Sequence, residues 1–195
     1  MNNFTTYFIL GRDHIASLGS YDHILFMLAL CIRYQFTDWK RILLLVTAFT
    51  IGHSLTLALS ALNMVNYSSK WIEFLIPCTI VLTAMNDFFV KKFTFRSTFP
   101  PIYFLALFFG LIHGLVFSNY LKTILGKGHH IVWELLAFNL GLEVGQLIIV
   151  FAILFISLVI VGLIKVSRRE YVLFISAGIF ALALQMAIER WPGWS

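Results

Sequence analysis

Hydrophobic residues dominate the chain in six long stretches, which short polar segments separate. A helix that crosses about 30 Å of hydrocarbon needs about 20 apolar residues, and each stretch is long enough. We therefore predict an all-α, polytopic membrane protein: a six-transmembrane-helix bundle that forms a single domain over residues 1–195. The predicted helices are His14 to Tyr34, Lys40 to Leu62, Trp71 to Val90, Pro101 to Leu121, His130 to Ile164 and Tyr171 to Trp191.

Two of these stretches depart from a simple span. The fifth, His130 to Ile164, is longer than a bilayer requires, so we expect it to tilt, to bend at Gly141 or Gly145, or to extend beyond the membrane. The first contains the segment ASLGS, in which glycine and serine disfavour a continuous helix. The spanning helix could therefore begin only near Tyr21, and whether the chain breaks around Gly19 stays open.

Lysine and arginine are unevenly distributed between the two sides of the predicted bundle. Nine lie in the connections after the first, third and fifth helices, and five lie on the other side. Since such residues are concentrated in cytoplasmic loops, both termini are predicted to lie outside the cytoplasm. The net charge of +5 therefore reflects topology rather than a nucleic-acid partner.

Ionisable side chains lie inside four of the predicted helices at a similar depth. Asp22 and His23 lie eight and nine residues from the outer end of the first helix, His53 nine from that of the second and His113 eight from that of the fourth. At about 1.5 Å per residue, each is about 12 to 14 Å deep, and Glu143 of the fifth helix is about 15 Å deep. An ionised group at such depth costs at least about 2.5 kcal/mol. We therefore expect these groups to face the bundle interior.

The residues around these groups indicate close helix packing. Asn139, Glu143 and Gln146 form one polar stripe on the fifth helix, and Gly141 with Gly145 forms a GxxxG pattern beside it. Small or hydroxylated residues also flank the histidines of the second and fourth helices: Thr47, Thr50, Gly52, Ser54, Gly110 and Gly114. The second, fourth and fifth helices are therefore predicted to pack around one site.

His14 and His23 can serve one site only if the chain breaks between them. On an unbroken helix they would point in opposite directions and lie about 13 Å apart along the axis. A helix that starts near Tyr21 also places Asp22 in its first turn, where a negative charge is favoured. We expect Asp22 and His23 to face a water-accessible cavity open to the outside.

Imidazole and carboxylate groups together favour borderline divalent metals such as Ni²⁺, Co²⁺, Zn²⁺ and Cu²⁺. The predicted metal ligands are His14, Asp22, His23, His53, His113 and Glu143. The predicted supporting polar residues are Ser54, Asn139 and Gln146. The alternative is that these groups bind no metal and form a proton relay or a structural polar core. We interpret His129 and His130 as a feature of an exterior loop, with metal recruitment as the alternative.

Four segments resemble the HupE/UreJ family of bacterial membrane proteins, in particular its second branch: GRDHIASLGSYDHILF, FTIGHSLTLAL, FGLIHGLVF and FNLGLEVGQ. They occur in the family's order and span most of the chain. The resemblance implies a permease-like protein of the bacterial inner (cytoplasmic) membrane that takes up nickel or cobalt. The resemblance implies that the polar residues of the family's motifs correspond to His14, Asp22, His23, His53, His113, Glu143 and Gln146 in this chain. The chain lacks the His-Pro that better-studied nickel permeases carry before the glycine and aspartate.

Two activities are compatible with such a site. The favoured one is a permease for a divalent transition metal; no Walker motif is present to support nucleotide-driven transport. The other is an intramembrane zinc-type metallohydrolase with Asp22 or Glu143 as general base, although the sequence contains no HExxH segment. No catalytic residue is assigned. The expected partners are the lipid bilayer and the metal ion, not a nucleic acid; a homo-oligomer or a partner protein stays open.

Overall fold

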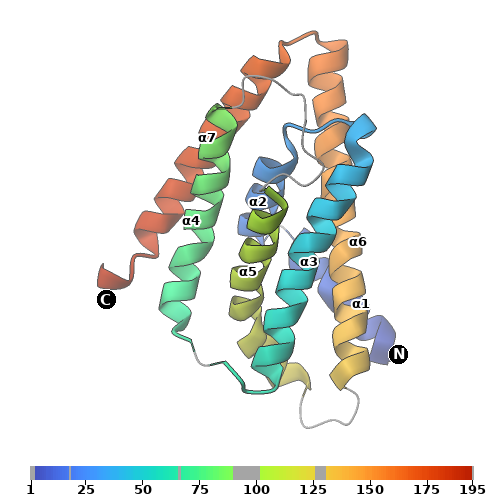
Figure 1. The fold of residues 1–195 in the computed structure, drawn as a ribbon, viewed down its shortest axis with the longest axis vertical. Coiled ribbons are helices and arrows are strands. Elements are labelled where there is room, and N and C mark those ends of the chain that lie inside the picture. Colours follow the sequence, from blue (N-terminus) through green and yellow to red (C-terminus); the bar gives the residue numbers. More distant parts are fainter. Residues whose placement is uncertain (1–2, 18, 66, 90–101, 126–130, 195) are drawn as a thin grey trace.

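The structure, a computed structural model, describes residues 3–17, 19–65, 67–89, 102–125 and 131–194. Over these ranges the chain is helical and contains no strand, and both chain ends lie toward the lower end of the view in Figure 1. The α-helices are α1 (Asn3–Ala16), α2 (Tyr21–Cys31), α3 (Trp39–Ala61), α4 (Ser69–Phe88), α5 (Ile102–Leu125), α6 (Ile131–Ser157) and α7 (Arg168–Glu189). The short segments are η1 (Phe36–Asp38), the π-helical η2 (Leu158–Leu163) and η3 (Pro192–Trp194).

Four helical segments are long and apolar enough to cross a membrane. They are Phe36–Ala61, Ser69–Phe88, Val132–Leu163 and Arg168–Glu189. The bent pair α1 and α2 would make a fifth, and within α5 the part Ile102–Ser118 is a shorter apolar helix. An integral membrane protein is thus supported by four spans among the described residues, whereas six spans and the orientation of the termini stay predictions.

The first predicted helix is two helices. Its predicted start at His14 is wrong, because α1 begins at Asn3 and ends at Ala16. A break, which the sequence left open, is present: α2 begins at Tyr21, and α1 and α2 differ in direction by 69°. At the break, the Ser20 amide donates to the Ser17 carbonyl, and the two serine hydroxyls lie 3.0 Å apart. Such local bonds compete with helix continuation.

The fifth predicted helix is longer than a bilayer requires, as expected. α6 continues directly into η2, and together they give a 32-residue apolar segment, Val132–Leu163. A π-helical segment has hydrogen bonds from residue i to i+5 and commonly marks a local insertion in an α-helix.

Glycine sets the distance between two pairs of helices. A Cβ atom on Gly110 of α5 would lie 2.2 Å from the Phe49 carbonyl oxygen of α3. A Cβ on Gly141 of α6 would likewise lie 1.9 Å from the Phe8 carbonyl oxygen of α1. Within each pair the helices run in the same direction, since successive glycines contact successive turns of the partner. The GxxxG pattern of Gly141 and Gly145 thus makes its close helix approach to α1.

The remaining helices complete the bundle around these two pairs. α4 and α7 pack against each other on the left of Figure 1, and α2 lies between them and α6. The interior where α2, α3, α5 and α6 meet holds the large aromatic side chains Phe26, Phe49, Phe109 and Phe138, all buried. This apolar interior surrounds the polar groups described below.

We predict that Gly110→Ala destabilises the protein, whereas Gly178→Ala on α7 does not. The added methyl at position 110 would overlap the α3 backbone, and overpacking costs about 1–3 kcal/mol. At position 178 no atom lies within 4 Å of the added carbon. Thermal unfolding in detergent measures the midpoint temperature of each variant. Equal midpoint temperatures for Gly110→Ala and Gly178→Ala would contradict the close contact between α3 and α5.

Candidate metal centre

Four histidines from four helices gather in the bundle interior. His14 lies near the end of α1, His23 in the first turn of α2, His53 in the middle of α3 and His113 in α5. His23, His53 and His113 are 7%, 0% and 1% exposed. The ring centres of His14 and His23 lie 4.9 Å apart, those of His14 and His53 5.9 Å, and those of His23 and His113 5.2 Å.

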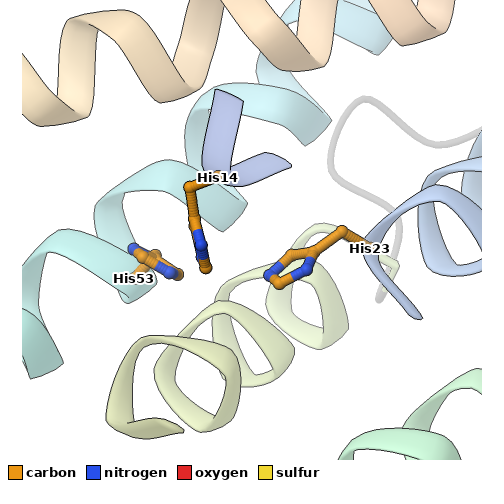
Figure 2. Close-up of side chains that lie close together, drawn as sticks. All are labelled: His14, His23 and His53. Atoms are coloured by element: carbon orange, nitrogen blue, oxygen red, sulfur yellow. The ribbon is translucent and has the colours of Figure 1, made fainter. Parts of the chain in front are cut away.

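His14, His23 and His53 form a group that lies close enough together to hold a metal ion. Each offers a ring nitrogen, and these three nitrogens lie within 4.8 Å of one another. Figure 2 shows His14 and His53 side by side, with His23 reaching toward them from α2. The break between α1 and α2 makes this possible, because it lets two histidines nine residues apart approach from different helices.

Several imidazole nitrogens in this cluster have no hydrogen-bond partner among the described residues. They are Nε2 of His14 and His113 and both ring nitrogens of His23 and His53, all buried. A buried polar atom that makes no hydrogen bond costs about 1–3 kcal/mol, so such atoms are rare without a ligand or water. The donor set therefore fits a metal ion, which would satisfy several of these nitrogens together.

The helix-pair contact positions His53 and His113. The Cβ that Gly114 lacks would lie 2.5 Å from the His53 carbonyl oxygen, so α5 reaches α3 at the turn that carries His53. His113 Nδ1 lies 2.8 Å from the Phe109 carbonyl oxygen one turn earlier in α5. Donation to that carbonyl fixes the proton on Nδ1 and leaves Nε2 as the ligand atom.

Aromatic rings enclose the histidines. Phe138 stacks on His53 with ring centres 6.4 Å apart, and Phe117 lies 3.8 Å from His14 by the same measure. Phe26 and Phe49 each lie 5.3 Å from His113. These rings form an apolar wall around the imidazoles.

Asp22 holds His23 rather than joining the three-histidine group. Its Oδ1 lies 3.3 Å from His23 Nδ1 and accepts a hydrogen bond from the His23 backbone amide. Arg190, just after α7, donates to Oδ2 of the same carboxylate at 3.4 Å and to the Tyr21 hydroxyl at 3.4 Å. A carboxylate on the second nitrogen of a ligating histidine fixes its ring and raises its basicity.

Glu143 and Gln146 lie in a separate polar layer. Thr47 donates to Glu143 Oε1 at 2.8 Å, and Thr50 donates to Gln146 Oε1 at 2.7 Å. Gln146 Nε2 also lies 3.8 Å from the Met27 sulfur. The structure does not bring Glu143 into the histidine group, so its role as a metal ligand stays a prediction.

The other predicted site residues have different surroundings. Ser54 donates to the Thr50 carbonyl of its own helix at 2.6 Å. Asn139 Oδ1 is buried and has no partner among the described residues, close in sequence to Phe138 of the aromatic wall. His129 and His130 lie outside the described residues.

Sequence reasoning missed the role of Arg190. The sequence could have indicated it, because the predicted topology places the end of the last helix, with Arg190, on the same side of the membrane as the start of α2, with Asp22. The role of Gly11 was also missed: a Cβ there would lie 2.0 Å from the Phe138 carbonyl oxygen. Because the sequence reading did not recognise α1 as a helix, its glycine had no predicted partner.

Fold and site together define a polytopic membrane protein with a buried imidazole cluster. The chain belongs to the HupE / UreJ protein family, which it matches over residues 1–190. The resemblance seen in the sequence motifs is thereby confirmed. No curated protein and no solved structure matches the chain.

We predict that Asp22→Asn weakens metal binding about 10–100-fold, the usual effect of losing such a supporting carboxylate. The amide keeps the size of the side chain but removes the charge facing His23 and Arg190. Asp13→Asn is the matched control, because Asp13 is exposed and pairs with Arg12 at 2.7 Å. Titration of both purified variants with Ni²⁺ measures their metal affinities. An Asp22→Asn affinity within twofold of that of the parent protein would contradict the role of Asp22 as a support for His23.

Proposed function

We propose that this protein is a permease that moves a divalent transition metal, nickel or cobalt, across the bacterial inner membrane. The observation that carries the proposal is the buried group of His14, His23 and His53, with ligand nitrogens within 4.8 Å of one another. Membership of the HupE / UreJ family supports it, because the motif resemblance implies nickel or cobalt uptake.

The donor set supports a borderline metal as the substrate. Imidazole nitrogen suits Ni²⁺, Co²⁺ and Zn²⁺, whereas Mg²⁺ and Ca²⁺ prefer oxygen ligands. Three neutral imidazoles leave the double charge of the ion uncompensated in an apolar interior. Two carboxylates supply negative charge nearby without binding the ion directly: Asp22 lies beside His23, and Glu143 lies in the next polar layer. A site whose direct ligands are neutral imidazoles binds the ion less tightly than one with carboxylate ligands. A moderate affinity suits a permease, because the metal must also leave the site.

Further polar groups lie between the histidines and the end of the bundle that is opposite the chain termini. Thr50 and Thr47 precede His53 on α3 by one and two turns, about 4.5 and 9 Å at the helical rise. Each holds a polar residue of α6, Gln146 and Glu143 respectively. If the termini are outside, as the lysine and arginine distribution predicts, this layer lies on the cytoplasmic side of the histidines. It then provides the next oxygen ligands on an inward path.

We predict that the purified protein binds close to one Ni²⁺ or Co²⁺ and carries it into proteoliposomes. His53→Ala and His113→Ala should lose most of this uptake, because each removes an imidazole from the cluster. Gln185→Ala, an exposed position on α7 that donates to Glu189, is the control. Elemental analysis and metal-sensitive dye uptake measure the two properties.

Each other result of this experiment points to another function. Folded histidine variants that still accumulate metal would overturn the permease proposal. Absence of bound metal in every sample would favour a polar core or a proton relay. Stoichiometric zinc without uptake would favour the hydrolase alternative.

Metal affinity should also fall as the pH decreases. A ligating imidazole must be unprotonated, and free imidazole side chains take up a proton near pH 6.5. Protons therefore compete with the metal on the acidic side, and the affinity should be highest in the neutral to mildly alkaline range. Isothermal titration between pH 5.5 and 8 measures the change; a constant affinity would argue against histidine ligands.

A further inference from the structure

A second buried polar cluster lies at the end of the bundle opposite the termini. Asp87, in the last turn of α4, is 2% exposed, and Arg33, just after α2, is 8% exposed. Arg33 Nη1 lies 3.9 Å from Asp87 Oδ1, and the Ser176 hydroxyl of α7 donates to Oδ2 at 3.4 Å. Three helices thus meet at one carboxylate, and neither the histidine cluster nor the Glu143 layer includes it.

The contacts of this carboxylate are long for a buried ion. Charge-assisted hydrogen bonds between a guanidinium and a carboxylate are usually about 2.7–2.9 Å, and both contacts of Asp87 exceed that range. A buried carboxylate with incomplete compensation is readily neutralised by a proton. In membrane helices, such ionisable residues commonly form proton pathways.

Among the described residues, both neutral and charged groups surround the cluster, including the Asp38–Arg41 pair near Tyr103. From α2, Cys31 lies within electrostatic range of Asp87. Tyr34 packs its ring 5.6 Å from the Arg33 guanidinium, and Tyr103 of α5 lies within electrostatic range of Arg33. Arg168, the first residue of α7, donates to the Arg33 carbonyl oxygen at 2.6 Å. Lys91 and Lys92 lie outside the described residues.

Helix α2 connects this cluster to the histidines. It is 11 residues long, about 16 Å at the helical rise, with His23 in its first turn and Arg33 just beyond its last. The break before Tyr21 separates α2 from α1. A displacement of the Arg33 end of α2 would therefore reach His23 along a single rigid helix.

We propose that Asp87 is a proton-binding residue that couples metal movement to proton movement, with Arg33 as its positioning partner; this rests on the permease function proposed above. The carboxylate takes up one proton and becomes a neutral acid, while Arg33 keeps its charge. The attraction between them is lost, which allows the Arg33 end of α2 to shift against its remaining contacts. Loss of the proton restores the pair and the position of α2.

Metal-driven proton flux in proteoliposomes tests the proposal. Vesicles hold a trapped pH-sensitive dye, and Ni²⁺, with Co²⁺ in parallel, is added outside. The parent protein should give a sustained proton flux that depends on the metal. Asp87→Asn should reduce this flux at least tenfold while binding metal in detergent within twofold of the parent, because an amide cannot exchange the proton.

Two further variants keep the test decisive. Asp38→Asn is the matched control, since Asp38 is a carboxylate at the same end that pairs with Arg41 at 3.0 Å, and it should keep the flux. Ser176→Ala keeps the Asp87 carboxylate but removes a donor to it. Because that donor contacts the proton-binding carboxylate, its loss should change the pH at which the flux is half-maximal. This shift tests the proposal even if Asp87→Asn does not fold.

The outcomes separate this inference from the permease function. A parent protein that neither binds nor moves metal overturns both. A parent that moves metal without proton flux, or an Asp87→Asn variant with undiminished flux, overturns the role of Asp87 and leaves the permease intact. An unchanged pH profile in Ser176→Ala likewise contradicts proton binding at Asp87.

Discussion

Backbone contact through glycine is the constraint on which the histidine cluster depends. Gly110 and Gly114 let α5 lie against the turn of α3 that carries His53, and Gly11 and Gly141 do the same for α1 and α6. With side chains in these positions each pair would move apart, and the imidazoles of four helices would no longer meet. Small residues at helix contacts are a general means of close packing in membranes, where lipid leaves little hydrophobic drive between helices.

The bundle satisfies its buried polar groups to very different degrees. The threonines of α3 hydrogen-bond to Glu143 and Gln146 across to α6, and this layer joins the two helix pairs. Asp22 is held between His23 and Arg190. The imidazole nitrogens between these groups are the exception, because most of them lack a partner among the described residues. Polar groups that are left unsatisfied inside well-paired surroundings are a feature of binding sites rather than of stable cores.

Counting residues along the chain was enough to predict much of this arrangement. The apolar stretches predicted most of the helices, and ASLGS indicated where a break would let His14 meet His23. Depth counted along single helices, however, does not show which residues meet across helices. Glu143 was expected at the depth of the histidines, yet it accepts a hydrogen bond from Thr47, about 9 Å along α3 from His53. The helix α1 was missed because the polar start of the chain concealed a face that packs against α6.

The pairing of α1 with α6 has a consequence for how the protein is assembled. α1 is synthesised before its glycine-lined partner, which begins only at Ile131. At about 5–20 residues per second, the ribosome needs on the order of ten seconds to deliver that partner. During this interval α1 lacks its partner surface, and His14 has no fixed place. The helices from α1 to α5 are therefore made before the complete imidazole cluster can form, because α6 must first arrive to hold α1.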